Sequence, residues 1–312
     1  MANKPEYFIG IDVSKNDLSV CIIFENTTHN FTIKNEKLKI LKFFAMYANL
    51  NSFCVFENTN TYCYDIMRAF DELGLAYSKL DPLKFSFFMK NQRKIKTDKS
   101  DAYLLAIYAK KFYDELIKSE FSEEYALLKS YQSGLALINK MLSQTKNFKE
   151  PLINVNNNSL EESFDEIIAS LIEQKKVLEE KVFDLVCELV PETKKILNKN
   201  KGISKSFAIY VLPLFWMNKD KTTKQITSFL GLVPNVHQSG TSINKCPHIS
   251  GGVKLARNTL YMCALTISKY NKDFAPLYQK HLNRGKPKKV ALIALARVFA
   301  RNIFRKYFKD DR

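Results

Sequence analysis

The chain has 312 residues, of which 46% are hydrophobic and 26% charged, so it is long enough for two domains and too apolar to be disordered throughout. Its 48 Lys and Arg residues outnumber its 32 Asp and Glu residues, which leaves a formal charge of +16. Such an excess favours a polyanionic partner, nucleic acid before membrane, because phosphate contacts dominate this kind of binding. Basic charge that serves only solubility is the alternative.

The cysteines and the apolar runs indicate the compartment. None of the six cysteines belongs to a Cys-x-x-Cys pair, a pattern typical of free thiols in a reducing compartment. They are Cys21, Cys54, Cys63, Cys187, Cys246 and Cys263. No charged-then-apolar leader opens the chain, and no run of about 18 apolar residues occurs in it. We therefore expect a soluble, cytoplasmic protein without a membrane partner.

The first expected strand, YFIGIDVSK at residues 7–15, carries an acid within an apolar run. The run predicts a strand buried on both faces, yet Asp12 lies between Ile11 and Val13. An unpaired buried carboxylate costs several kcal/mol, so we expect either a buried base or a metal ion at the sheet edge to compensate for it. The alternative is an Asp that merely ends the strand, because turn residues follow at 14–16.

Further apolar segments extend this sheet. In chain order we expect strands at 18–24 and 29–33, a helix at 36–48, a strand at 53–57, a helix at about 62–73, a strand at 76–80 and a helix from 102 onward. This is the order of a ribonuclease-H-like mixed sheet, with Asp12 on the central first strand and Glu57 at the end of the adjacent fourth. Because strands lie about 4.8 Å apart, the two acids would repel each other unless a divalent metal bound there.

Two more acids, Asp98 and Asp101, stand at the start of the next helix, three residues apart and therefore on one face. Helix capping and the helix dipole explain this pair at least as well as metal binding does. The bases around the pair favour metal binding, because they would attract a phosphate backbone to the same place: Arg93, Lys94, Lys96 and Lys99. The acid quartet, Asp12, Glu57, Asp98 and Asp101, can hold two Mg²⁺ ions, with water and phosphate oxygens as the remaining ligands.

The middle of the chain is predicted to be helical. A helix is expected at 125–148, and apolar residues at spacings of 3, 4 and 7 predict a long amphipathic helix, plausibly a coiled coil, at 160–189. This helix either packs on its own domain or forms a dimerisation arm. A glycine turn at 201–206 precedes an apolar helix at 207–215 and resembles half of a helix-hairpin-helix that binds phosphate; a plain helix start fits equally well.

A second stretch with chemical potential, at 229–258, is predicted to be a loop because it is rich in Gly, Ser, Asn and Pro. Ser239 precedes a glycine, and positive charge is near: Lys245, Lys254 and Arg257. A serine needs a base or a metal to become a nucleophile, so the residues alone favour an ordinary loop serine. Zinc binding by His237, Cys246 and His248 is disfavoured, because their spacing is irregular and a fourth ligand is lacking.

The last expected helix, at 288–308, places three arginines four residues apart on one stripe: Arg297, Arg301 and Arg305. Residues 281–312 contain ten Lys or Arg against two acids. We expect this tail to contact nucleic acid.

Several segments resemble one known family. GIDVSKNDLSV, FENTNTYCYDIMRAFDELG and KIKTDKSDAYLLA resemble the N-terminal, RuvC-like domain of the DEDD-type insertion-sequence transposases. FLGLVPNVHQSGTSINK and ISGGVKLARNTL resemble the serine-containing C-terminal domain of the same family. These are bridge-RNA-guided DNA recombinases, related to the Piv-type DNA invertases. The family usually has Ala and Gly shortly after the glutamate, where this chain has Asn58 and Asn60.

The resemblance implies a domain order and a mechanism. It implies a RuvC-like metal-binding domain at 1–120, a helical coiled-coil and dimerisation region at 121–195, and a mainly helical transposase domain at 196–312. The acid quartet would hold Mg²⁺, and its carboxylates are the only residues that indicate this metal. Ser239, with Ser242 as its nearest competitor, would attack donor and target DNA to give a covalent ester that a 3′ hydroxyl then reverses. Partners would be DNA, a structured guide RNA and further protomers in a dimer or tetramer that share a composite centre.

Three other functions remain open at this point. A metal-dependent endonuclease of the Holliday-junction class would use water as the nucleophile. A sugar-kinase-like ATPase is suggested by GIDVS, but the nine glycines offer no further phosphate loop beyond Gly251-Gly252. A non-catalytic nucleic-acid-binding protein would leave Asp12 and Glu57 without a purpose in apolar strands. The residues do not reveal the DNA sites, the guide RNA, the number of protomers, or the choice between transposition and inversion.

Overall fold

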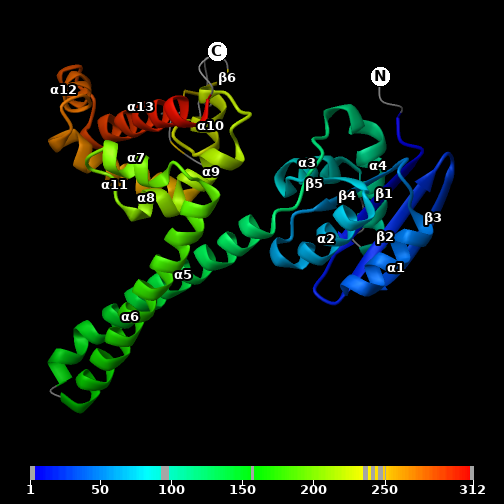
Figure 1. Ribbon diagram of the computed structural model, residues 1–312, viewed down its shortest axis with the longest axis horizontal. Coiled ribbons are helices and arrows are strands. Elements are labelled where there is room, and N and C mark those ends of the chain that lie inside the picture. The colour runs from blue at the N-terminus through cyan, green and yellow to red at the C-terminus, as the bar shows by residue number, and fades with distance from the viewer. Residues whose placement is uncertain are drawn as a thin grey trace. The chain divides into compact units, whose positions relative to one another are not determined.

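The computed structural model describes residues 4–92, 98–155, 158–234, 238–239, 243–244, 249 and 251–309. The chain divides into two compact units, a first unit at Met1–Ala126 and a second unit at Leu127–Arg312. Figure 1 shows a twisted sheet flanked by helices in the first unit and mainly helices in the second. Within the described ranges, no helix is both long and apolar enough to cross a membrane.

The first unit is an α/β fold. Its elements are β1 (Tyr7–Val13), β2 (Asp17–Phe24), β3 (Thr27–Lys34), α1 (Lys37–Tyr47), β4 (Ser52–Glu57), η1 (Asn60–Cys63), α2 (Tyr64–Leu73), β5 (Ala76–Leu80), α3 (Pro82–Gln92), α4 (Asp98–Phe112) and η2 (Tyr113–Glu115). The strands form one five-stranded sheet in the order β3-β2-β1-β4-β5, with β1 antiparallel to β2 and parallel to β4. This mixed sheet, with β1 at its centre, fits the ribonuclease-H-like order predicted from the sequence.

The helix α3 is an addition to the sequence prediction, which ends the fifth strand at Asp81-Pro82 without a helix after it. In the structure Pro82 is the first residue of α3. A proline fits the first turn of a helix, because the amide hydrogen that it lacks would have no partner within the helix there. The same residue pair therefore both ends a strand and begins a helix.

Helices cover both faces of the sheet (Figure 1). α1 and α2 pack on the face that contains Ile9, Ile11 and Phe56. α3 and α4 pack on the opposite face, which contains Phe8 and Phe53. Because successive residues of a strand point to opposite faces, the position of a residue along β1 or β4 decides which helices it meets.

Gly10 allows α4 to lie directly on β1. A Cβ atom at this position would be 2.1 Å from the carbonyl oxygen of Ala102 and 2.3 Å from the amide nitrogen of Ala106. At the other end of the contact, the ring of Phe8 packs against that of Tyr113, just after α4, with 6.1 Å between centroids. The helix therefore runs antiparallel to β1, and its first turn lies at the carboxyl end of this strand.

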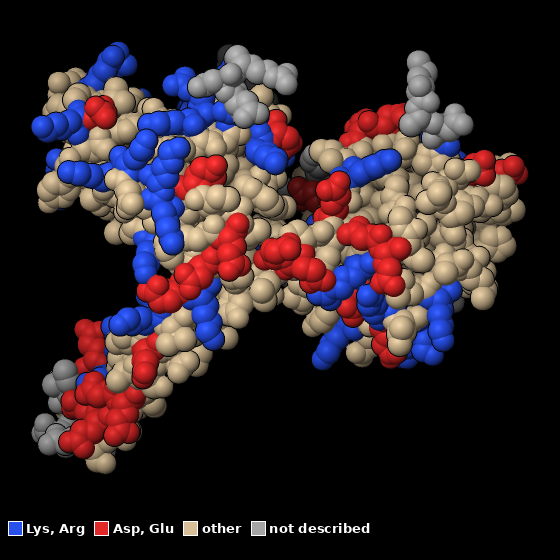
Figure 2. Space-filling model, viewed as in Figure 1, with Lys and Arg blue, Asp and Glu red and all other residues tan. Residues whose placement is uncertain are grey.

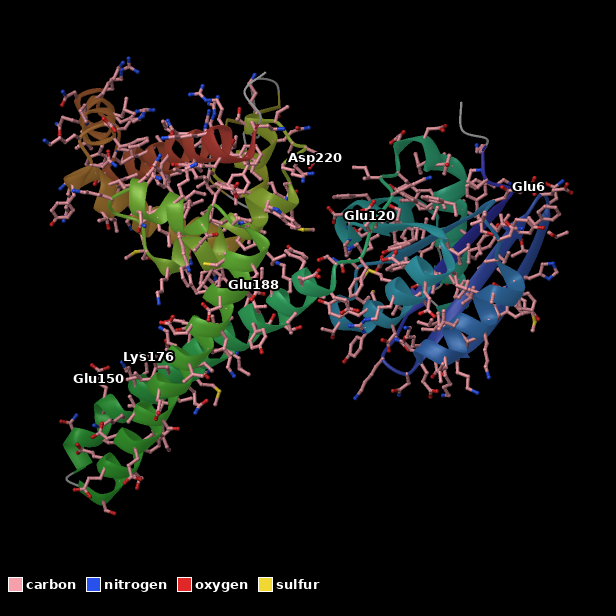
Figure 3. The ribbon with its side chains drawn as sticks, in the orientation of Figure 1. Glu6, Glu120, Glu150, Lys176, Glu188 and Asp220 are labelled. Carbon is pink, nitrogen blue, oxygen red and sulfur yellow. The ribbon has the colours of Figure 1, made fainter. Side chains whose placement is uncertain are left out.

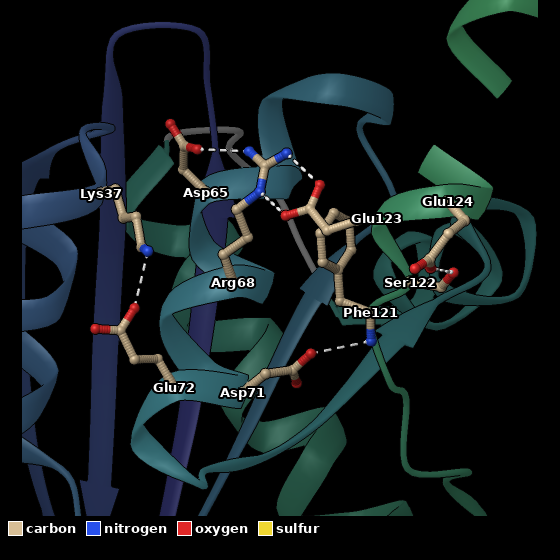
Figure 4. Close-up of polar contacts among 9 residues, drawn as sticks. All are labelled: Lys37, Asp65, Arg68, Asp71, Glu72, Phe121, Ser122, Glu123 and Glu124. Atoms are coloured by element: carbon tan, nitrogen blue, oxygen red, sulfur yellow. Dashed lines mark hydrogen bonds and ion pairs between the residues drawn. The ribbon is translucent and has the colours of Figure 1, made fainter. Parts of the chain in front are cut away.

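Arg68 of α2 holds the beginning of α5 (Glu123–Lys149) on the first unit, as Figure 4 shows. Its guanidinium donates to the Glu123 carboxylate at 2.5 and 2.8 Å and to Asp65 at 3.0 Å. It also lies over the ring of Phe121, 5.2 Å from the centroid. The hydrogen bond from Arg68 lowers the pKa of the Glu123 carboxyl.

Replacing Arg68 with methionine should lower the free energy of unfolding by less than about 1 kcal/mol near neutral pH, because exposed ion pairs contribute little. A carboxyl whose pKa is lowered by folding stabilises above its unfolded pKa, and this contribution is lost as pH falls through the folded pKa. The difference between Arg68→Met and wild type should therefore shrink at acidic pH. Urea unfolding at about pH 7 and about pH 3 measures it. A difference that stays constant with pH would contradict a role through Glu123.

The second unit is mainly helical. Besides most of α5, its elements are η3 (Glu150–Val155), α6 (Asn158–Leu189), α7 (Thr193–Lys199), α8 (Lys205–Tyr210), α9 (Leu212–Met217), α10 (Thr223–Phe229), β6 (Gln238–Ser239), β7 (Ile243–Asn244), α11 (Lys254–Tyr270), α12 (Ala275–Asn283) and α13 (Lys288–Phe308). The core of this unit is built on α13. Its Phe299 contacts Phe207 and Phe274 with ring centroids 5.8 and 5.3 Å apart, and its Phe304 contacts Phe215 at 5.2 Å.

α5 and α6 form a helical hairpin joined by η3. Gly134 of α5 faces α6, since a Cβ there would be in van der Waals contact with Leu178, 3.4 Å away. Near the turn of the hairpin, the rings of Phe148 and Phe164 have centroids 5.0 Å apart. Figure 3 shows charged side chains such as Lys176 projecting from the hairpin. The long predicted helix thus packs against a helix of its own chain, and a coiled coil between protomers stays a prediction.

Two helices, α8 and α9, take the place of the single helix predicted at 207–215. The helix is interrupted at Val211, and Pro213 lies in the first turn of α9. A proline is tolerated in the first turn of a helix but disrupts a helix that continues through it. The glycine turn before α8 contains Gly202 with a φ of 97°, and a Cβ there would be 3.0 Å from Ile267 of α11. Gly202 therefore serves helix packing, while a phosphate contact at this turn stays a prediction.

Candidate functional site

Asp12 and Glu57 lie next to each other at one edge of the sheet. The last pair of the parallel β1–β4 ladder is Ile11 opposite Phe56, and each acid is the next residue on its strand. Both acids fall on the α4 side of the sheet, because they alternate with Ile11 and Phe56, which face α1 and α2. Both side chains are partly buried. Two carboxylates from distant parts of the sequence therefore meet at the carboxyl ends of β1 and β4.

The first turn of α4 covers the same edge. Asp101 lies in this turn, with only 9% of its surface exposed, and it directly precedes Ala102, which packs on Gly10. The hydroxyl of Ser100 donates to the Asp101 carboxylate at 3.4 Å. Asp98 is the first residue of α4, and its side chain lies outside the described part of the structure. The fold thus brings β1, β4 and the start of α4 together.

The donor set at this edge fits a hard divalent cation, because Mg²⁺ and similar ions prefer carboxylate oxygens. Among the described side chains, no three His, Cys, Asp or Glu residues are arranged as a metal-binding group. That set does not include Asp98. The zinc candidates His237, Cys246 and His248 lie outside the described residues. Asp12, Glu57 and Asp101 therefore do not by themselves form such a group among the described side chains, and the fourth carboxylate, that of Asp98, is undescribed.

The structure describes none of the four basic side chains predicted around these acids. Arg93, Lys94 and Lys96 lie outside the described residues, and Lys99 belongs to α4 but its side chain is not described. Their contact with a phosphate backbone stays a prediction.

Cys63 fastens the turn that follows Glu57. Its Sγ lies 2.9 Å from Thr59 Oγ1, accepts a hydrogen bond from the Thr59 amide at 3.3 Å and donates to the carbonyl oxygen of Glu57 at 3.4 Å. Burial raises the pKa of the Cys63 thiol, which keeps it protonated as a donor. From the sequence Cys63 is only one of six free thiols; the short spacing to an acid that ends a strand is the signal that could have distinguished it.

Ser239 lies on a short hairpin and not in the irregular loop that the sequence predicts. β6 and β7 are antiparallel, and Ser239 is paired with Ile243. Three residues that include Gly240 connect the pair, which is a usual length and composition for a hairpin link. The side chain of Ser239 is not described, and Ser242 and Lys245 lie outside the described residues.

Four residues, which we call the glycine clasp, bring together the two ends of the segment 232–250, which contains Ser239. They are Gly231, Gly251, Gly252 and Arg257. A Cβ at Gly252 would be 2.4 Å from the Gly231 amide nitrogen, so the two backbones touch. Both residues have positive φ, 69° at Gly231 and 67° at Gly252. Arg257 Nη1 donates to the carbonyl oxygen of Gly251. Arg257, predicted to bind nucleic acid, thus holds the base of this segment, and Lys254 is exposed in the same helix turn.

Basic and polar residues line two hollows beside α10. One hollow is formed with α13 and is lined by Thr223, Val298, Arg301, Asn302 and Arg305. The other adjoins the glycine clasp and is lined by Lys221, Gln225, Ser228, Phe229 and Gly252. Arg305 is exposed, whereas Arg297 and Arg301 are partly buried. Figure 2 shows Lys and Arg side chains gathered over the helices of this unit.

Comparison with known families identifies the chain. Residues 9–149 match the DEDD transposases of the IS110 type, and residues 194–279 match the transposase IS116/IS110/IS902 family. The chain is a DEDD transposase of the IS110 type. The transposase is 27% identical to the pilin gene-inverting proteins of Moraxella bovis and Moraxella lacunata, over 93% of this chain and 92% of each relative. The family predicted from the sequence is confirmed.

The two matched regions divide the candidate residues of the transposase. The acid quartet lies within residues 9–149, and Ser239 lies within residues 194–279. The protein is a DNA recombinase that binds DNA, and DEDD transposase domains generally use divalent metal ions. The family match does not by itself assign a role to any single residue.

Proposed function

We propose that the transposase cuts and rejoins DNA through a covalent bond to Ser239, with Mg²⁺ held by the acid quartet of Asp12, Glu57, Asp98 and Asp101. One observation carries the proposal. Asp12, next to last in β1, and Glu57, last in β4, both follow directly after the last pair of the ladder, on the face covered by α4. Neighbouring acids from distant sequence positions are costly for stability and useful for binding a cation.

The chemistry follows from these groups. The carboxylates would hold the cation, which prefers oxygen ligands of this kind. Mg²⁺ bound there supplies positive charge where the transition state of phosphoryl transfer develops negative charge. The Ser239 oxygen attacks the scissile phosphorus, the bond from phosphorus to the 3′ oxygen breaks, and the serine proton leaves as the 3′ oxygen gains one. A 3′ hydroxyl of another strand then attacks the phosphoserine ester and releases the serine.

Nucleic acid would lie along the basic surface of the second unit. The hollow between α10 and α13 presents Arg301 and Arg305 beside Thr223 and Asn302, a combination of charge and neutral donors that suits phosphate groups. Lys221 and the exposed Lys254 extend this surface toward the Ser239 hairpin. By similarity to the family, a structured bridge RNA would choose the target DNA by base pairing, and donor and target DNA would share this surface.

Assembly would proceed through the helical hairpin. The following apolar side chains of α5 and α6 are between 43% and 58% exposed: Leu137, Met141, Ile167, Ile172 and Val177. Such side chains on a two-helix arm are typical of a surface that packs against another protomer. A dimer or tetramer would place the acids of one protomer beside the serine of another. The relatives are named for inverting a pilin gene, and the same strand exchange in this transposase would give either inversion or transposition.

Trapping a covalent protein–DNA adduct tests the proposal. The substrate is a labelled plasmid that carries the DNA flanking the transposase gene, with the RNA that copurifies with the protein. In Mg²⁺, wild type should give a slower band on a denaturing gel, and Ser239→Ala should give none, because its side chain has no oxygen to attack phosphorus. Ser242→Ala is the matched control and should form the adduct at the wild-type level.

Two results would contradict the proposal. An adduct that persists in Ser239→Ala and disappears in Ser242→Ala would show that the nucleophile is Ser242, three residues further along the chain. DNA cutting by wild type without any adduct would instead show the alternative, a Holliday-junction-type endonuclease that uses water as its nucleophile.

A further inference from the structure

We propose that Asn35 is a positioning residue that sets the distance between the two acid-bearing segments of the sheet. Asn35 follows β3, and its side-chain amide donates both of its hydrogens to backbone carbonyls of two other segments. One hydrogen bond reaches the Ser14 carbonyl oxygen at 2.8 Å and the other reaches the Tyr62 carbonyl oxygen at 3.0 Å. This inference rests on the proposed metal site at Asp12 and Glu57.

The two carbonyls belong to the segments that leave the acids. Ser14 is two residues beyond Asp12, and Tyr62 is in η1, which follows Glu57. The β1–β4 ladder has its last pair at the residues just before the acids. Asn35 therefore joins the two chain segments again just beyond the acids. Each carboxylate lies between a ladder pair on one side and the Asn35 bridge on the other.

A primary amide suits this bridge. Its two N–H donors diverge in one plane, whereas an aspartate offers only acceptors and a leucine offers neither. The orientation of the amide follows from its partners, because an oxygen in place of the nitrogen would face two carbonyl oxygens. Within the described part of the chain, the Asn35 Oδ1 accepts no hydrogen bond from the protein, so both side-chain hydrogen bonds of Asn35 are made by its N–H groups.

The segment after Glu57 is held at both ends. The Cys63 thiol bonds the Glu57 carbonyl at 3.4 Å, and Asn35 bonds the carbonyl of the residue before Cys63. The backbone amide of Asn35 also donates to the Asn16 carbonyl at 2.9 Å, which ties the bridge to the turn between β1 and β2. Groups that position metal ligands through hydrogen bonds commonly change metal affinity about 10- to 100-fold when removed.

The test compares Asn35→Ala and Asn35→Leu with a matched control, Asn49→Ala. The Asn49 Oδ1 also takes part in two hydrogen bonds, which it accepts from the Asn51 amide at 2.9 Å and the Ser52 hydroxyl at 3.3 Å, but Asn49 lies just before β4, at the opposite end of this strand from Glu57. Binding of Mn²⁺ to the full chain without nucleic acid is measured by electron paramagnetic resonance. The dissociation constant should rise about tenfold in both Asn35 variants and stay at the wild-type value in Asn49→Ala.

A second readout separates positioning from general stability. In the metal-free protein, hydrogen exchange should quicken at residues 14–17 and 58–63 in the Asn35 variants and only around residues 49–52 in the control. Asn35→Leu fills the volume of the side chain and serves as the test if the alanine variant does not fold. The proposal is overturned if the Asn35 variants bind Mn²⁺ as tightly as the control does, or if their exchange rises evenly over the first unit.

Asp12→Ala distinguishes this failure from failure of the proposed function. If Asp12→Ala loses Mn²⁺ binding and the Asn35 variants keep it, the metal site stands and the role of Asn35 is wrong. If Asp12→Ala binds Mn²⁺ as wild type does, the metal site itself is wrong, and the inference about Asn35 is wrong with it.

Discussion

Replacing Gly10 with alanine should destabilise the first unit more than any other single methyl group added to it. The new Cβ would lie 2.1 Å from the Ala102 carbonyl oxygen and 2.3 Å from the Ala106 amide nitrogen, both backbone atoms of α4. A backbone cannot turn aside as a flexible side chain can, so the helix must move away from β1. Overpacking of a core typically costs about 1–3 kcal/mol, and a clash this short should reach or exceed the upper end. That is a large share of the roughly 5–15 kcal/mol that stabilises a domain.

The movement should also disable the site, because α4 brings Asp101 to the edge of the sheet where Asp12 lies. Thermal unfolding followed by circular dichroism and limited proteolysis of the first unit measure the effect. Gly74→Ala is the matched control. It adds the same methyl group where the nearest atom is 3.8 Å away, at a φ of 66°, and should cost about 1–2 kcal/mol through backbone strain alone. Equal stability of the two variants would contradict the close packing at Gly10.

Replacing Asp12 with asparagine should slow DNA cutting by about a thousandfold or more while leaving the fold intact. The two side chains have the same shape, but the amide carries no charge with which to hold a divalent cation. Metal ions supply several kcal/mol of transition-state stabilisation, and each 1.36 kcal/mol is worth about a factor of ten in rate. Removing one of four carboxylates is expected to lose most of this contribution.

The measurement is the rate of plasmid cutting at saturating DNA over a range of Mg²⁺ and Mn²⁺ concentrations, with thermal unfolding beside it. Asp65→Asn is the control, because Asp65 is a carboxylate of the same unit whose partner is Arg68 on its own helix. It should cut DNA at the wild-type rate. Cutting by Asp12→Asn within tenfold of wild type would show that this acid is not a metal ligand.

The placement of Asp12 and Glu57 could be predicted because it depends on strand order alone. Apolar runs that end in acids, together with the order of strands and helices, are enough to put β1 in the centre and β4 beside it. The role of Gly10 could not be predicted in this way. It depends on the crossing of β1 by α4, a contact between segments more than 90 residues apart that leaves no periodic signal.

Prolines explain the two main differences in the helices. Pro82 begins α3, and Pro213 separates α8 from α9, although an apolar pattern continues across the break. The bridge made by Asn35 was hidden for another reason. An asparagine between a strand and a helix looks like a turn residue, and only the folded chain shows which carbonyls its amide reaches. Ser239 is predicted as the nucleophile from family resemblance, and this role stays a prediction, whereas its hairpin and the glycine clasp depend on tertiary contacts.

The touching backbones of Gly231 and Gly252 have a consequence for how this enzyme can diversify. They act as a fixed stem, so α10 and α11 keep their relative placement whatever chain lies between them. Doubling the length of a flexible loop costs only about 0.6 kcal/mol in closure entropy. We therefore expect the length of the intervening segment to tolerate change on either side of Ser239, without rebuilding the helical scaffold, as long as the serine itself is kept.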